Sequence, residues 1–221
     1  MEAPVNGKHF RAGKREGAGL LSARDRHMCG TMPVQKTSGY LAGQLLIAMP
    51  QMRDPRFTRA VVYLCAHTAE GAMGIVINRP FDGLSFSELL EQLEIPPTPA
   101  CKAIRIHFGG PVEGGRGFVL HSADYMHETT MMVDDGVALT ATIDVLKAMS
   151  EGIGPKASLL ALGYAGWGAG QLDAEIRENV WLNAPSDERL LFDEDINHKW
   201  ERAIHKLGID FGALSGDAGH A

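Results

Sequence analysis

The segment Asn78-Arg79-Pro80 combines an amide, a guanidinium and a strand-ending proline directly after an apolar run. Pro80 prevents that run from continuing as a normally paired strand. Side chains at strand ends often project into functional sites. Arg79 is therefore predicted either to pair with an internal carboxylate such as Glu175 or to bind an anionic ligand, and the residues leave both alternatives open.

A glycine-rich segment, residues 163–170, follows the apolar run 158–162 and precedes a polar stretch compatible with a helix. A strand, a glycine loop and a helix N-terminus can together bind a phosphate through backbone N–H groups. The glycine spacing matches no phosphate-binding fingerprint, and no Lys or Arg occurs between Lys156 and Arg177. A close-packed structural loop is the favoured interpretation, and Trp167 is the residue that supports a binding role.

A second glycine cluster, residues 108–118, joins two predicted strands. The favoured interpretation is a tight β-connection that needs positive φ angles. The alternative is a backbone-lined pocket edge on which Arg116 is the charged group.

The histidines and serines match no catalytic or metal-binding motif. His107 and His121 end apolar runs and are predicted to be hydrogen-bonded framework residues. Ser122 follows His121 directly, but neighbouring residues on a strand point to opposite faces, and the nucleophile-elbow motif is absent. The sequence therefore predicts no catalytic residue, no metal site and no cofactor.

Charge is distributed unevenly along the 221 residues. Residues 1–36 carry seven Lys or Arg and three Asp or Glu, a net charge of +4, and the remainder has 14 and 24, a net charge of −10. An acidic folded part disfavours specific binding to duplex DNA. The three cysteines form no CxxC pair, and the longest apolar stretch, residues 41–49, is too short to span a bilayer. We therefore expect a cytoplasmic protein without a membrane segment.

The apolar patterning predicts an α+β fold. Residues 1–38 lack a sustained apolar period and are predicted to form a disordered leader before a single domain, residues 39–221. Strands are predicted at 45–48, 60–65, 74–78, 104–108, 118–121 and 158–162, with another at 129–133. Helices are predicted after Ser85, which forms a capping box with Glu88, and at 140–150, 169–178 and 196–207. Strands and helices do not alternate regularly, which disfavours a doubly wound sheet.

Three longer motifs resemble the AlgH/YqgE family of bacterial proteins: GAMGIVINRP at 71–80, GGPVEGGRGFVLH at 109–121 and GYAGWGAGQLDAE at 163–175. The resemblance covers residues 39–221. It implies a mixed, partly closed barrel-like β-sheet with helices packed outside it. Members of this family are labelled as transcriptional regulators without a settled mechanism, so the resemblance transfers no catalytic residue.

Two hypotheses for function follow. The first is a regulatory or interaction protein that acts indirectly, through an unknown protein or small-molecule partner, and whose folded domain does not bind DNA specifically. The second is an enzyme or ligand-binding module with a pocket near Arg79 and Trp167. The residues expected in that pocket are Asn78, Arg79, Arg116, Trp167 and Gln171. Convergence of these side chains in one cleft would favour the second hypothesis.

Overall fold

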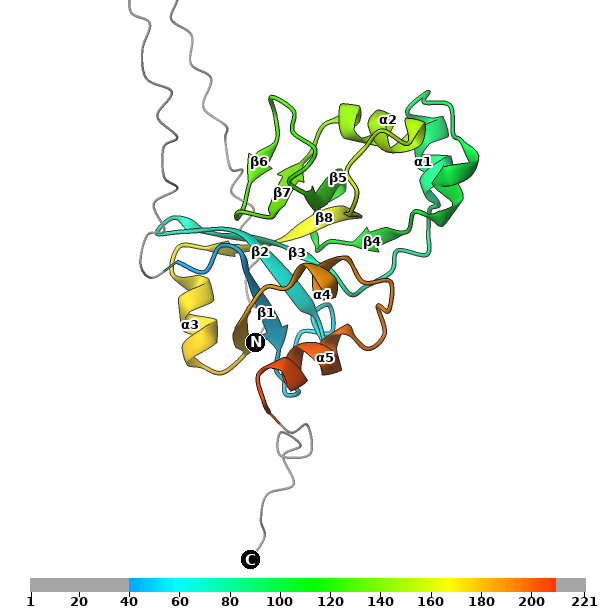
Figure 1. Cartoon of the computed structure of the whole chain (residues 1–221). Helices are drawn as coiled ribbons and strands as arrows, with labels where there is room; N and C mark the ends of the chain where they lie inside the picture. The colour runs from blue at the N-terminus through cyan, green and yellow to red at the C-terminus, as the bar shows by residue number, and fades with distance from the viewer. Residues whose placement is uncertain (1–39, 210–221) are drawn as a thin grey trace, which may run out of the picture. The chain divides into compact units, whose positions relative to one another are not determined.

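In residues 40–209, one curled, mostly antiparallel sheet forms half of a barrel, with five α-helices packed around it (Figure 1). The computed structural model describes residues 40–209. Over this range the strands are β1 (Gln44–Ala48), β2 (Val61–Thr68), β3 (Gly71–Val76), β4 (Ile106–Phe108), β5 (Val112–Ser122), β6 (Met131–Met132), β7 (Val137–Thr140), β8 (Ser158–Gly168) and β9 (Trp181–Pro185). The helices are α1 (Phe86–Gln92), α2 (Ile143–Glu151), α3 (Gln171–Arg177), α4 (Glu188–Phe192) and α5 (Lys199–Lys206), with a 3-10 helix η1 (Pro99–Ala103). The α+β class and the mixed, partly closed sheet expected from the sequence are confirmed.

Strand β8 is the centre of the sheet, whose order is β6-β7-β5-β8-β3-β2-β1-β9. Its first half lies between β5, which is antiparallel to it, and β4, which is parallel. Its second half pairs with β3. One long bent strand therefore joins the two halves of the domain, and Figure 1 shows β8 running between the β5–β7 strands and the β1–β3 strands.

The glycine-rich segment at 163–170 is largely part of β8, so the predicted end of that strand at residue 162 is wrong. Gly163 has a φ of +73°, and a Cβ atom there would lie 2.4 Å from the carbonyl oxygen of Gly110. A Cβ atom on Gly109 would lie 2.2 Å from the carbonyl oxygen of Gly163. Two backbones approach so closely here that side chains are excluded. Close packing of the backbone at Gly109, Gly110 and Gly163 is confirmed, whereas residues 163–168 belong to β8 and not to the predicted loop. The positive φ angles predicted for the second cluster occur at Gly110 and Glu113.

Three groups of buried apolar side chains hold the helices against the sheet. One group packs α4 and α5 against β1, β2 and β5, and includes Leu190, Leu191, Trp200 and Ile204. A second packs α1 and α2 against β4, β5 and β8. A third packs α3 against the other side of β1 to β3, together with Trp167 and Trp181. Each helix therefore depends on an apolar face, as expected for short helices in water.

Several predicted elements differ from the structure at their ends. The capping box between Ser85 and Glu88 is confirmed at α1. The helix predicted from residue 140 begins at Ile143, because Thr140 ends the unpredicted strand β7. Strand β9 was also not predicted, because Asn183 and Pro185 interrupt its apolar pattern. The predicted leader, residues 1–38, lies outside the described residues.

Candidate functional site

Asn78 connects the end of β3 to the strand beside it. Its side-chain Oδ1 accepts a hydrogen bond from the Val61 N–H at 2.8 Å, and its Nδ2 donates to the Arg59 carbonyl, also at 2.8 Å. Both halves of the amide are therefore used by main-chain groups of the segment that leads into β2. This geometry gives Asn78 a structural role.

Arg79 holds the same segment from the next position. Its Nη2 donates to the carbonyl oxygens of Thr58 at 2.7 Å and Pro55 at 3.3 Å. Of the two alternatives predicted for Arg79, the ion pair with Glu175 does not form, because the guanidinium instead donates to carbonyls of the connection between β1 and β2. Nearby Asp54 adds a favourable charge, although burial lowers the pKa of Arg79 from its ordinary value.

Glu175 is the acceptor at the centre of a different cluster. Its Oε2 accepts hydrogen bonds from the indole N–H groups of Trp167 at 2.9 Å and Trp181 at 2.8 Å, and its Oε1 accepts from Nε2 of Gln171 at 2.8 Å. Gln171 Oε1 in turn accepts from the Gly168 N–H. The two indole rings meet edge to face at 5.9 Å. Trp167 and Gln171, both predicted to bind a ligand, thus join α3 to the ends of β8 and β9.

Arg116 lies on a third part of the surface. Residues 113–116 bulge out of β5, because Val112 pairs with Tyr164 whereas Gly117 pairs with Leu162. The Arg116 side chain forms an exposed ion pair with Glu113 at 3.1 Å and lies 5.0 Å from the centre of the Phe118 ring. These contacts stabilise the bulge locally.

The five predicted pocket residues do not meet in one cleft. Trp167 pairs with Ala72 near the start of β3, whereas Asn78 follows the end of that strand. Asn78 follows Ala72 by six positions of extended chain, a distance of about 20 Å. The structure brings Trp167 and Gln171 together at Glu175 and holds Asn78 and Arg79 at the other end of β3. Ligand binding at these residues stays a prediction.

His107 and His121 are buried, hydrogen-bonded framework residues, as predicted. His107 Nδ1 lies 3.2 Å from the Leu160 carbonyl, and burial lowers the pKa of His107 to about 4. His121 bonds to the Ser122 carbonyl at 2.9 Å and to the Thr140 hydroxyl at 2.8 Å. Within residues 40–209, no group of three His, Cys, Asp or Glu side chains is placed to hold a metal ion.

Lys199 is a fully buried cation that the sequence-based interpretation missed. Its ammonium group donates to the carbonyls of Leu191 at 2.7 Å and Ile77 at 3.2 Å. Burial lowers the pKa of Lys199 to about 8, and the charge of Asp193 only partly opposes that effect. Its position was a detectable signal, because Lys199 shares the apolar face of the last helix with Ala203, four residues later.

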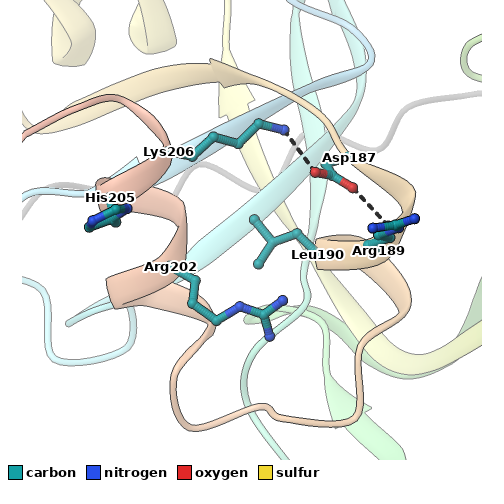
Figure 2. Close-up of a pocket in the computed structure, with 6 residues that line it drawn as sticks. All are labelled: Asp187, Arg189, Leu190, Arg202, His205 and Lys206. Atoms are coloured by element: carbon teal, nitrogen blue, oxygen red, sulfur yellow. Dashed lines mark hydrogen bonds and ion pairs between the residues drawn. The ribbon is translucent and has the colours of Figure 1, made fainter.

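An open cavity of about 380 Å³ lies between α4 and α5 (Figure 2). Four of its six lining side chains carry nitrogen groups; the lining comprises Asp187, Arg189, Leu190, Arg202, His205 and Lys206. Lys206 is paired with Asp187 at 3.2 Å, which lowers the pKa of Asp187, and Arg202 is paired with Asp193. Arg202, His205 and Lys206 lie three and four positions apart on α5 and therefore share one face of the helix. This spacing is visible in the sequence. We call this site the α4–α5 pocket.

An apolar groove of about 160 Å³ lies where α1 ends and α2 begins. Its lining is mostly aliphatic: Leu93, Gly117, Val119, Thr140, Ala141, Thr142, Ile143 and Leu146. The hydroxyl groups of Thr140 and Thr130 are 2.8 Å apart, and those of Thr142 and Thr129 are 3.3 Å apart. The residues just before β6 therefore border the groove. Met132 pairs with Ala138, two residues before Thr140, so Met132 lies on the same face of the sheet as the groove, whereas Met131 faces the other side. Ile143 and Met132 are about 40 % exposed, and we call the groove together with Met132 and the edge of β6 the β6 surface.

Comparison with known proteins places this half-barrel α+β fold in a family. The family model described as DUF179, AlgH-like, matches residues 45–212. A UPF0301 protein of Rhodospirillum rubrum is 58% identical over 188 residues, which cover 85% of this chain and 98% of that protein. A UPF0301 protein of Bradyrhizobium diazoefficiens is 50% identical over 217 residues, or 95% and 98% of the two chains.

The solution structure of the AlgH protein from Pseudomonas aeruginosa is similar, with a TM-score of 0.70 and 45% identity over 85% of this chain and 99% of that chain. A crystal structure of a Corynebacterium diphtheriae protein has a TM-score of 0.60 at 19% identity, over 75% and 86% of the two chains, and supports the fold alone. This chain therefore belongs to the AlgH-like family. None of these names states an activity.

Proposed function

We propose that this protein acts by binding a partner protein through the β6 surface, and thereby influences gene expression indirectly. The observation that carries the proposal is an apolar groove on the same sheet face as the exposed Met132 of the edge strand β6. Exposed apolar patches on a folded domain commonly mark interaction sites, and methionine adapts to varied partners because its side chain is flexible.

Strand β6 is open to pairing with a partner because it is the last strand in the sheet order. Its pairing partner in the sheet is β7. An edge strand leaves backbone N–H and C=O groups that an extended segment can use. A partner segment lying along β6 could place an apolar side chain in the neighbouring groove.

The charges around the groove indicate what that segment contains. Glu91, Glu94, Glu128 and Asp144 are exposed and lie close in sequence to residues that line or border the groove, whereas the exposed cations in the same positions are Arg116 and Lys147. The surroundings are therefore acidic. A segment with apolar side chains flanked by Lys or Arg would match this surface in both shape and charge.

A cytoplasmic location is part of the same proposal. Cys65 and Cys101 are buried free thiols, which supports a reducing compartment. Within residues 40–209, no helix is long and apolar enough to cross a membrane.

Site-specific photocrosslinking in the native host tests the proposal. We expect a photoreactive residue in place of Met132 to capture a defined partner, and the substitution Ile143→Glu to abolish that adduct. Ile153 is a matched control because it is an exposed isoleucine, at 69 %, beyond the other end of α2. The crosslinker at position 153 should give no such adduct, and Ile153→Glu should not affect capture at position 132. Equal capture from both positions would contradict the proposal.

A further inference from the structure

We propose that the α4–α5 pocket binds a small organic anion, a molecule with a phosphate or carboxylate group attached to an apolar body. This site is separate from the β6 surface and does not depend on the proposed function. Three cationic side chains line the pocket, from two helices: Arg189 on α4, and Arg202 and Lys206 on α5.

The acidic groups at the pocket are already occupied. Asp187 is the one carboxylate that lines it; Oδ2 accepts from the Lys206 ammonium group, and Oδ1 accepts from the Arg189 backbone N–H at 2.9 Å. Asp193, outside the lining, accepts from Arg202. Two carboxylates therefore oppose three permanent cations, which leaves the pocket with a net positive charge.

Arg189 supplies the donors that a bound anion would use. Its exposed guanidinium forms no hydrogen bond or ion pair with the side chains or carbonyls of residues 40–209. A guanidinium presents parallel N–H groups that match two oxygens of a carboxylate or phosphate. Anion binding would thus use a group that the fold leaves unpaired within the described part of the chain, and would not break a native contact.

The arrangement of the side chains indicates an apolar part in the ligand. Figure 2 shows Arg202 and Lys206 extending from α5 towards α4, with Leu190 between them at the floor of the pocket. Leu190 and the methylene stems of the long cations form an apolar lining below the charged groups. The cavity of about 380 Å³ falls in the lower part of the range of small-molecule sites, and it is much larger than a bare phosphate needs.

The net charge of the domain makes this pocket distinctive. Residues 37–221 carry a net charge of −10, so most of the surface repels an anion. A local positive site on such a surface favours an anion at one position. Because the cations are partly exposed, the affinity should fall as salt rises.

The test is an amide NMR titration of the full-length protein with three probes: phenyl phosphate, inorganic phosphate and benzyl alcohol. We expect phenyl phosphate to shift the amide signals of Arg189, Leu190 and Lys206. Inorganic phosphate should bind severalfold more weakly, because it cannot contact Leu190, and benzyl alcohol should leave these signals unchanged. Benzoate should reproduce the phenyl phosphate shifts if the pocket accepts either type of anionic group.

Matched arginine variants make the result specific to the pocket. Arg189→Gln should weaken phenyl phosphate binding about fivefold, since it removes one partly exposed charged contact. Arg53→Gln removes another exposed arginine, outside the pocket, and should leave the affinity unchanged. Any of three results would overturn the proposal: no shift of the pocket amides, equal shifts with benzyl alcohol, or equal weakening by the two variants.

Discussion

Glu175 and Lys199 are charged residues at opposite ends of β3, and neutral polar groups hold both of them. The Glu175 carboxylate accepts from two indoles and an amide near the start of β3, whereas the Lys199 ammonium donates to two carbonyls near its end. The partners of Glu175 are side chains within eight residues of it, on α3 and on the flanking strands β8 and β9, but those of Lys199 are main-chain groups. Glu175 therefore fixes the positions of neighbouring side chains, whereas Lys199 occupies a position that backbone carbonyls define.

Removing the Glu175 carboxylate should give the largest effect. Glu175→Ala leaves the buried indole N–H groups of Trp167 and Trp181 without an acceptor. Because two charge-assisted hydrogen bonds are lost, we expect the free energy of unfolding to fall by roughly 3–5 kcal/mol. Urea unfolding followed by tryptophan fluorescence measures this change directly.

Glu175→Gln is the control for that experiment because it keeps a carbonyl oxygen for the indoles. The amide removes the negative charge and faces the Gln171 amide, so we expect a loss of roughly 1–2 kcal/mol. If the alanine variant were no less stable than the glutamine variant, Glu175 would not organise its cluster.

Lys199 should make stability depend on pH. Its pKa is lowered from 10.5 to about 8 in the folded protein, so between these values the unfolded chain binds more protons than the native one. The Lys199 contribution to stability therefore rises as pH increases from 8 to 10.5, by up to roughly 3 kcal/mol. Below pH 8 both states are protonated, and the full desolvation cost remains.

Lys199→Met isolates this effect, since methionine has a similar length and no charge. Burial raises the pKa values of Tyr63 and Cys65, and those groups lower stability over the same alkaline range. The quantity to measure is therefore the stability of the wild type minus that of the variant, from urea unfolding at several pH values. A difference that stays constant between pH 8 and 10.5 would show that Lys199 is not desolvated.

The sequence predicted most of the fold but not the contacts of its polar residues. Apolar runs and the Ser85 capping box are local signals, and they located α1 and the central strands. The bend of β8 depends on how closely Gly163 approaches Gly110, a contact between residues 53 positions apart. No local pattern contains that information, and the predicted strand therefore ended six residues too early.

The candidate sites show the same limit. Arg79 was predicted correctly to need acceptors, but its acceptors are backbone carbonyls, which every residue carries and no motif marks. The α4–α5 pocket depends on a short helix, α4, which the apolar pattern did not predict. The basic spacing of Arg202 and Lys206 was visible in the sequence, but the helix opposite it was not.

Arg79 lies at the same end of β3 as Lys199, and like Lys199 it donates to backbone carbonyls. Its substitution tests how much such contacts contribute when the cation is only half-buried. Arg79→Gln should lower the free energy of unfolding by about 1 kcal/mol, because water can reach the carbonyls of Pro55 and Thr58. The connection between β1 and β2 should loosen first. Amide exchange at Phe57 and Ala60 should accelerate more than exchange in β8, and uniform acceleration would contradict a local role.

Arg116 should give the smallest effect, and it completes the comparison between buried and exposed charges. Its ion pair with Glu113 joins side chains that are 56% and 40% exposed, and such pairs contribute little because water screens them. Arg116→Gln should therefore change the free energy of unfolding by no more than about 0.5 kcal/mol.

Part of that change reflects the contact with the Phe118 ring, which Arg116→Lys should reduce without removing the charge. Urea unfolding in low and high salt separates the two contributions, since salt weakens the ion pair but has little effect on the ring contact. A loss as large as that for Glu175→Ala would show that the bulge at 113–116 is a stability centre, and that burial does not distinguish the charges that organise this fold.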